Sequence, residues 1–413
     1  MAEYSQPLLV LRSWRIPLVL AIAFCVLSHD RLMAQPPNSP PPPPPPPALG
    51  GPLQGLTPGQ LTDWQSGKTQ FETSMVPTNG LGPIFNGNSC VACHSGPAVG
   101  GSSPINTTRF GRTSGTNFDP LISLGGSLLQ SKALAAFGVE IIPSEANTVA
   151  ERNTQPLFGL GLIEAIPAST ILTGVRTMPD NGVLGRAAMV VDPVTGQTVV
   201  GRFGWKAQQP TLLAFAADAF VNEIGITNRI YNVENAPNGN QTLLKEMEPK
   251  NVPTPNDQTN PSTGKAGIDR LADFMRWTAP PPPPAANATT LTGGKLFTQI
   301  GCAACHTPSM STGINAQNPA FNNKTVGLYS DLLLHKMGSL ADGIAQGNAL
   351  PSEMRTAPLW GLSASAPYLH DGRAKTVDDA IRGHSGEGEF SVTQYLNLTN
   401  AQRQQLLAFL NSL

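Results

Sequence analysis

Two copies of the pattern Cys-x-x-Cys-His constrain this chain more than any other feature of its sequence. They use four of the five cysteines, Cys90 and Cys93 before His94, and Cys302 and Cys305 before His306. In this pattern two thiols add across the vinyl groups of one porphyrin, and the adjacent histidine ligates its iron. A redox dithiol or half of a zinc site would explain a Cys-x-x-Cys pair, but neither requires a histidine directly after it, twice. The motifs therefore predict two covalently bound haem c groups, with His94 and His306 as iron ligands.

The N-terminal segment has the pattern of a secretory signal peptide, which we place at residues 1–34. Basic Arg12 and Arg15 precede an apolar run at residues 16–27, which is shorter than the roughly 20 residues that span a bilayer. An uncleaved N-terminus is the only route by which we expect contact with a membrane. Export agrees with the haem motifs because bacterial c-type haem is attached outside the cytoplasm, so the expected location is periplasmic or secreted.

Two proline-rich segments suggest how the rest of the chain is divided. Residues 35–51 contain a run that is almost all proline and predict an extended polyproline II tether. A second run, residues 280–284, lies in a linker that we place at 279–288. The predicted domains are an N-terminal cytochrome c-like domain at 52–278 and a C-terminal cytochrome c domain at 289–413, with one haem each. The formal net charge is −1, so we expect no nucleic-acid partner.

The two predicted domains carry similar parts in the same order, which indicates a duplication whose first copy is enlarged by insertion. Helix starts are marked by capping boxes of Thr376 with Asp379 and of Thr399 with Gln402. Residues 212–221 read as a buried helix, and strands are few, with 189–191 expected to pair with 198–202 across a turn. The predicted fold class is mainly α.

Four short segments resemble the bacterial di-haem oxidoreductase family, whose members are also labelled peroxidases or thiol oxidoreductases. The segments are residues 202–206, 333–338, 355–362 and 366–373, and the likeness covers nearly all of residues 60–413. More distantly, that family is similar to di-haem cytochrome c peroxidases and to the di-haem enzyme that matures a tryptophylquinone cofactor. The resemblance implies peroxide chemistry at one haem, fed with electrons through the other.

The resemblance also implies two catalytic residues. The wider superfamily places a tryptophan between the haems and a glutamate over the reactive haem, and Trp205 and Glu223 match these positions loosely. An indole can relay electrons, and a buried carboxyl can move a proton between the oxygens of peroxide. The alternatives are a core aromatic residue for Trp205 and a carboxylate at a helix end for Glu223.

The first haem is predicted to lack a second histidine. No histidine lies between the two motifs, so the first half of the chain offers none besides His94. Many di-haem cytochrome c peroxidases rest with two histidines on their first haem, and this chain departs from that pattern. We expect a first haem that is open to peroxide without prior reduction, unless a loop of the second half or one of four methionines supplies a ligand: Met75, Met178, Met189 or Met247.

For the second haem, Met337 is the expected sixth ligand, because methionine raises the potential and suits an entry point for electrons. Met354 is the runner-up, and His335 and Tyr368 are the lower-potential alternatives. An equally weighted alternative is that Met337 only fills the core and does not bind iron. His370 is expected to hold a turn or a propionate, and His384 is expected to be structural. Arg152 and Arg355 stand at matching places in the two halves, where their guanidinium groups can pair with haem propionates.

The predicted function is reduction of hydrogen peroxide to water. Electrons would enter at the haem of His306 from a small redox donor such as a cytochrome c or a cupredoxin and pass by way of Trp205 to the haem of His94. The alternatives are an oxidase that modifies a partner protein or a thiol, and an electron-transfer cytochrome without catalysis. The resemblance also suggests calcium between the domains, although no Asp-rich loop requires it.

Overall fold

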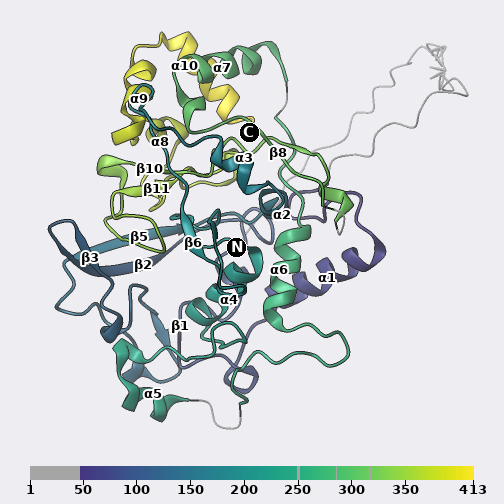
Figure 1. Cartoon of the computed structure of the whole chain (residues 1–413), viewed down its shortest axis with the longest axis vertical. Coiled ribbons are helices and arrows are strands. Elements are labelled where there is room, and N and C mark those ends of the chain that lie inside the picture. Colours follow the sequence, from purple (N-terminus) through teal and green to yellow (C-terminus); the bar gives the residue numbers. More distant parts are fainter. Residues whose placement is uncertain (1–46, 249–251, 285, 316–317) are drawn as a thin grey trace, which may run out of the picture. The chain divides into compact units, whose positions relative to one another are not determined.

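The computed structural model describes residues 47–248, 252–284, 286–315 and 318–413. The predicted signal peptide and most of the proline-rich tether lie outside the described residues. The described residues form one compact unit (Figure 1). The proposed boundary at 279–288 stays a prediction. Within the described part of the chain, no helix is long and apolar enough to cross a membrane.

The first haem motif lies next to a pair of closely packed helices, α1 (Pro58–Glu72) and α6 (Gly267–Trp277). Thr57 caps α1, because its hydroxyl accepts from the backbone N–H of Gln60 and the Gln60 side chain accepts from the N–H of Thr57. The helices touch at Gly67, where a Cβ atom would lie 2.2 Å from the carbonyl oxygen of Arg270. A glycine is therefore required for this approach.

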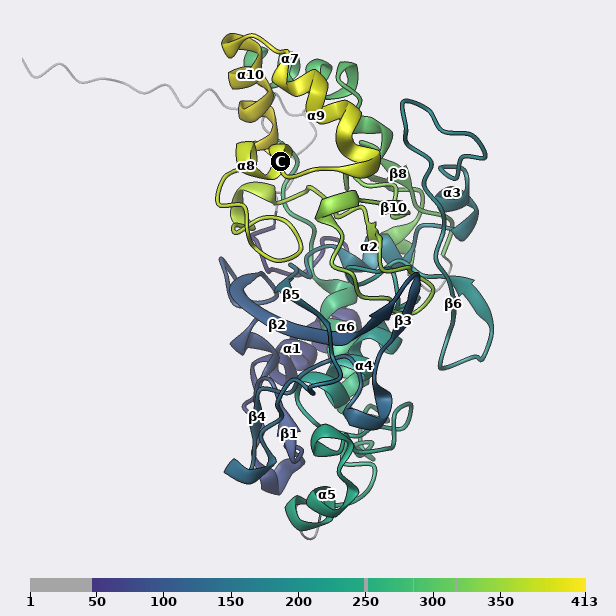
Figure 2. The ribbon, with the colours of Figure 1, turned by 90° about the vertical axis from the view of Figure 1, so that its left-hand side faces the viewer.

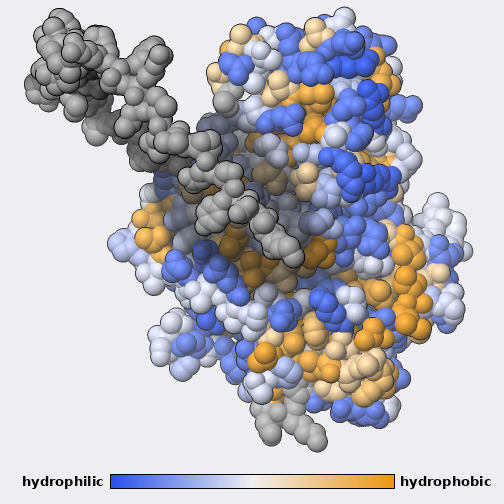
Figure 3. Space-filling view, turned by 180° about the vertical axis from the view of Figure 1, so that it is seen from behind, coloured by the Kyte–Doolittle hydropathy of each residue, from blue (hydrophilic) through white to orange (hydrophobic). Residues whose placement is uncertain are grey.

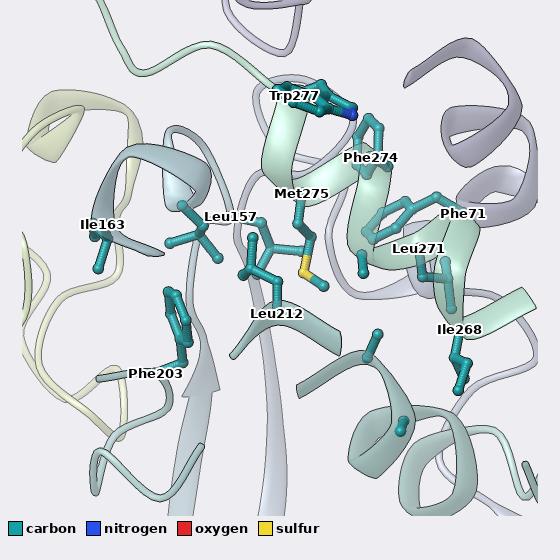
Figure 4. Packing of buried hydrophobic residues seen from close by; sticks show 14 of the residues in the cluster. Phe71, Leu157, Ile163, Phe203, Leu212, Ile268, Leu271, Phe274, Met275 and Trp277 are labelled. Atoms are coloured by element: carbon teal, nitrogen blue, oxygen red, sulfur yellow. The ribbon is translucent and has the colours of Figure 1, made fainter. Parts of the chain in front are cut away.

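Apolar side chains from several elements close the main core around these helices (Figure 4). Phe71 of α1 packs on Phe274 of α6 with ring centroids 4.7 Å apart. The helix α4 (Leu212–Glu223) adds Leu212 and Phe220 to the same core. Its N-terminus is capped by the hydroxyl of Thr211, which accepts from the N–H of Ala214. The predicted buried helix at 212–221 is thereby confirmed.

Three shorter helices complete the first half of the described chain. They are α2 (Leu160–Glu164), α3 (Ala168–Leu172) and α5 (Gln241–Met247). The helix α2 packs against both α4 and α6, so it belongs to the same core.

A three-stranded antiparallel sheet in the order β3-β2-β5 crosses the molecule (Figure 2). Its strands are β2 (Ser103–Ser114), β3 (Asn117–Asp119) and β5 (Thr148–Thr154). In its register Thr107 faces Arg152 and Arg109 faces Ala150. The sequence predicts short strands only, whereas β2 is long. Its pairing with β5, which is distant in the sequence, leaves little local signal in β2 itself.

The remaining strands form four short antiparallel pairs. They are β1 (Ile84–Phe85) with β4 (Lys132–Ala133), β6 (Met189–Val191) with β7 (Thr198–Val200), β8 (Met310–Ser311) with β9 (Thr325–Val326), and β10 (Leu334–Lys336) with β11 (Glu353–Arg355). The β6–β7 pair confirms the predicted hairpin, in which Val191 faces Thr198, but its second strand ends at Val200 rather than at residue 202.

The second haem motif lies beside a separate helical cluster, made of α7 (Ala288–Gln299), α8 (Val377–Arg382), α9 (Glu389–Leu396) and α10 (Asn400–Leu410). Phe297, Leu406, Phe409 and Leu410 fill its core. Both predicted capping boxes are present, at Thr376 of α8 and at Thr399 of α10.

The surface mixes apolar with polar side chains, as Figure 3 shows for one face. The most exposed apolar residues include Ile122, Phe137, Ile141 and Val233, each more than half exposed.

Candidate functional site

The first haem motif forms a tight turn that presents its cysteines and histidine together. Cys90–Ala92 is a 3-10 helix, and the backbone N–H of His94 donates to the carbonyl of Cys90 at 3.0 Å. The Nδ1 of His94 lies 3.1 Å from the carbonyl oxygen of Gly101, so Nδ1 carries the proton and the lone pair is on Nε2. Burial lowers the pKa of His94 to about 4. The ring is therefore neutral, which is the form that ligates a metal.

The second motif repeats this geometry in the other half of the chain. Cys302–Ala304 is again a 3-10 helix, and the Nδ1 of His306 lies 3.0 Å from the carbonyl oxygen of Tyr329. Burial lowers the pKa of His306 to about 4 as well. A backbone carbonyl that holds the far nitrogen is the usual second contact of a ligating histidine.

Each motif contributes side chains to the wall of a cavity. The four cysteines of the motifs form no disulfide. Cys90, Cys93 and His94 line one cavity of about 200 Å³, and Cys305 and His306 line another of about 230 Å³. The first cavity thus combines two free thiols with a neutral imidazole, and the second combines the thiol of Cys305 with the imidazole of His306. These donors are the kind that hold a haem c.

Glu223 lies in the first cavity, at the C-terminal end of α4. Its Oε2 accepts from the Nδ2 of Asn86 at 2.9 Å, and the Oδ1 of Asn86 accepts from the N–H of Ser131. Burial raises the pKa of Glu223, although the charge of Arg109 opposes this. The carboxyl is thus fixed in place and keeps its proton to a higher pH than a solvated glutamate does.

Arg109 is a cavity residue that the motifs did not indicate. It lies on β2 and lines the first cavity, its Nη1 is 3.4 Å from the Oγ of Ser127, and its buried Nε has no hydrogen-bond partner within the described residues. Only the pairing of β2 with β5 brings this arginine to the cavity. The alternation of residues along β2 is the one sequence signal from which the position of Arg109 could have been predicted.

The ligands available to the first haem are few. Within the described residues, the lining of the first cavity comes from residues 71–275 and contains no histidine besides His94. None of the four methionines considered from the sequence lines it. Met275 of α6 does line it and was missed, because its helical pattern read as plain core.

The second cavity holds both methionines considered for the second haem. Met337 and Met354 line it together with Tyr368, His370 and His384. Arg355 and Trp360 are also in its wall. The choice of Met337 over Met354 stays a prediction.

His335 also lines this cavity, but both of its ring nitrogens are already engaged. Nε2 lies 2.9 Å from the Oδ2 of Asp331, and Nδ1 lies 2.8 Å from the Oε2 of Glu387. Burial alone would lower the pKa of His335, but hydrogen bonds with Asp331, with the Cys305 thiol and with Glu387 raise it to about 12. A protonated imidazole has no lone pair for iron, so this arrangement disfavours His335 as a ligand.

Trp205 lies in the wall that both cavities share. Its indole Nε1 donates to the carbonyl oxygen of Asn153 at 2.9 Å, and its own carbonyl accepts from the N–H of Arg355 at 2.9 Å. The ring of His370 meets the indole edge-on, with centroids 6.3 Å apart. The indole is therefore held by residues of both halves of the chain.

Arg152 and Arg355 are buried beside the cavities, and each has partners within the protein. Arg152 lines the first cavity, and its Nε donates to the Oδ2 of Asp342 at 2.8 Å. Arg355 lines the second cavity, and its Nε donates to the carbonyl oxygen of Gly204 at 2.7 Å. Propionate pairing therefore stays a prediction for both, and these contacts give each a structural role as well.

One cluster among the described residues has three side chains close enough to hold a metal ion, namely Cys305, Asp331 and His335. Calcium takes oxygen ligands, and Cys305 belongs to the haem motif. This cluster therefore gives no support to the suggested calcium ion.

The match to a protein family agrees with the motifs. The family described as "Di-haem oxidoreductase, putative peroxidase" matches residues 141–413, and no curated protein matches the chain. Among solved structures, hydrazine synthase from Kuenenia stuttgartiensis is 15% identical, with 85% of this chain and 87% of that chain covered and a TM-score of 0.39. A MauG-like protein associated with microbial copper homeostasis is 14% identical, with 89% and 92% covered and a TM-score of 0.39. The diheme peroxidase BthA from Burkholderia thailandensis E264 is 14% identical, with 85% and 86% covered and a TM-score of 0.37.

Proposed function

The chain belongs to the di-haem oxidoreductase family, and from this premise we propose that it is a periplasmic or secreted peroxidase that reduces hydrogen peroxide to water. The observation that carries the proposal is a fixed, buried carboxyl, Glu223, in a cavity whose only histidine among the described residues is His94. A carrier of electrons needs no such acid beside its haem.

The residues that would hold the two cofactors are the paired cysteines and the histidine of each motif. Cys90 and Cys93 would bind the first haem, with His94 as ligand, and Cys302 and Cys305 the second, with His306 as ligand. When bound, haem supplies an iron that takes up peroxide and exchanges single electrons.

The reaction consumes two electrons and two protons for each peroxide, breaks the O–O bond and releases two molecules of water. Glu223 would accept a proton from the near oxygen of peroxide. It would then deliver this proton to the far oxygen, which leaves as water. The raised pKa of Glu223 brings the carboxyl closer to the range in which one group can both take and give a proton. Asn86 keeps the carboxyl oriented through this exchange.

Trp205 would relay the electrons, since its indole lies in the wall common to both cavities. Electrons would come from a small redox protein, such as a cytochrome c or a cupredoxin, and would enter at the second haem. Met337 as sixth ligand would suit that entry point by raising its potential.

The test is the stoichiometry of the purified holoprotein with hydrogen peroxide and a reduced small cytochrome c. The proposal predicts two donors oxidised for each peroxide consumed, at a rate that rises with peroxide concentration. Donor oxidation that is independent of peroxide would indicate an electron-transfer cytochrome. Peroxide consumption that requires an added thiol or protein and spares the donor would indicate an oxidase. Either result would overturn the proposal.

A further inference from the structure

We infer that Asp342 is a positioning residue for Trp205, holding the indole between the two cavities through Arg152 and Lys206. The inference rests on the proposed function, because it assigns Asp342 to the relay of electrons. Asp342 itself lines neither cavity and touches no reacting group.

Asp342 is the carboxylate at the centre of a buried cluster of three charges. Its Oδ2 is 2.8 Å from the Nε and 2.7 Å from the Nη2 of Arg152, and its Oδ1 is 2.7 Å from the Nζ of Lys206. The side chains of Asp342 and Lys206 are fully buried and that of Arg152 is 5% exposed. Each oxygen of Asp342 thus pairs with a different cation.

Both cations are sequence neighbours of the groups that place the indole. Lys206 directly follows Trp205, and Arg152 directly precedes Asn153, whose carbonyl accepts the indole N–H. One carboxylate therefore fixes the distance between the backbone that carries Trp205 and the strand β5 that receives its hydrogen bond.

The cluster also ties the two halves of the chain at this point. Arg152 and Lys206 precede the second haem motif, whereas Asp342 follows it in the segment between β10 and β11. Lys206 further donates to the carbonyl oxygen of Glu353 at the start of β11. The wall that separates the cavities is thus held by residues that precede the second haem motif and by residues that follow it.

The charges depend on one another. Burial lowers the pKa of Lys206 to about 8, while Asp342 opposes this shift. Burial would raise the pKa of Asp342, but Arg152 and Lys206 hold it below its ordinary value. Without the carboxylate, Arg152 and Lys206 would lose the counter-charge that they share, so one of these side chains moves or Lys206 gives up its proton.

The experiment compares the holoprotein variants Asp342→Asn, Asp342→Glu and Trp205→Phe, with Asp119→Asn as control. Asp119 pairs with Arg112 on the exposed surface, so its loss should change nothing. Each protein is reduced by two electrons and mixed rapidly with peroxide, and oxidation of the second haem is followed optically. Peroxide binding at the first haem is followed in the same traces.

We expect Asp342→Asn to slow oxidation of the second haem by about tenfold or more, since a misplacement of about 1 Å can cost on the order of 10²-fold. Peroxide binding and the resting spectra of both haems should be unchanged, which a general loss of structure would not allow. Asp342→Glu should recover part of the rate, because it restores the charge.

If Asp342→Asn does not fold, Lys206→Gln serves, because the pair of Arg152 with Asp342 remains. A variant that folds and transfers electrons at the wild-type rate overturns the inference. If Trp205→Phe slows the transfer and the variants of the cluster do not, Asp342 is not a positioning residue but the proposed relay stands. If Trp205→Phe has no effect, the relay itself is wrong and the inference fails with it.

Discussion

At the scale of single residues, the site depends on titratable side chains whose pKa is shifted by burial. Glu223 shows this most clearly, because its pKa is raised by burial and its orientation is set by Asn86. The motifs predicted the haem-binding residues from their spacing. They did not indicate Arg109 or Met275, which reach the first cavity only because β2 and α6 fold against it.

Replacement of Glu223 by glutamine should lower kcat/KM for peroxide about 10²–10³-fold, since an amide neither accepts nor returns the proton at stake. Resting spectra and donor affinity should be unchanged. Steady-state oxidation of a reduced cytochrome c measures this. Glu246→Gln, at an exposed position on α5, is the matched control, and equal loss in both variants would remove Glu223 from the mechanism.

The sixth ligand of the second haem is tested by Met337→Leu against Met354→Leu. Both methionines line the second cavity, but Met354 is buried and Met337 is only partly buried. The reduction potential therefore separates loss of a ligand from loss of packing better than stability does. We expect Met337→Leu to lower the reduction potential of the second haem and to remove the spectral signature of methionine ligation. A potentiometric titration in which only Met354→Leu shows this change would transfer the assignment to Met354.

At the scale of elements, the contact of α1 with α6 supports the first haem site, because Phe71 packs on Phe274 and meets the ring of His94 with centroids 6.0 Å apart. Gly67→Ala would force a Cβ to within 2.2 Å of the carbonyl oxygen of Arg270. We expect it to reduce the free energy of unfolding by about 3 kcal/mol. Gly59→Ala, in the same helix with no atom within 4 Å of its Cβ, should change it by less than about 1 kcal/mol.

Urea unfolding of the two holoproteins under one set of conditions measures the difference. If Gly67→Ala and Gly59→Ala unfold at the same midpoint, the close approach of the helices is not what stabilises this site.

Elements whose signal is local were the ones predictable from the sequence. The capping boxes at Thr376 and Thr399 and the hairpin of β6 with β7 depend on residues a few positions apart, and the structure has all three. The sheet of β2 with β5 depends on pairing across the intervening loop. Such pairing is decided by packing rather than by propensity, so the pattern did not reveal it.

At the scale of the whole described unit, the predicted order of two haem motifs is present, whereas the contacts between the halves were not foreseen. The sequence predicts roles toward haem for Arg152, Arg355 and Trp205. The contacts of Arg152 with Asp342, and of Arg355 with Gly204 and with the carbonyl of Trp205, join the halves of the chain. Pairings so distant in sequence leave no trace in either segment alone.

Stability should also depend on pH through a residue remote from both cavities. Burial, together with the charge of Glu248, raises the pKa of Glu234 to about 7 from an ordinary value of 4.5. A raised carboxyl pKa means that the folded state prefers the protonated form, so its contribution is complete below about 4.5 and is lost as the pH rises through 7. Glu234→Gln should therefore stabilise the protein at pH 8 by about 1–3 kcal/mol and have little effect at pH 4.5.

Urea midpoints of the holoprotein at the two pH values measure this, with Glu246→Gln as the exposed control. A variant that is equally stabilised at both pH values would show that packing, not the proton, is responsible.

The central claim is that the first haem, at His94, is ready for peroxide without prior reduction. The most direct measurement is the resting ferric spectrum of the purified holoprotein, optical and electron paramagnetic, followed by one equivalent of peroxide. We predict one high-spin and one low-spin haem and an immediate spectral change at the high-spin haem. Two low-spin haems that do not respond to peroxide, before or after reduction, would contradict the account and make the protein a carrier of electrons.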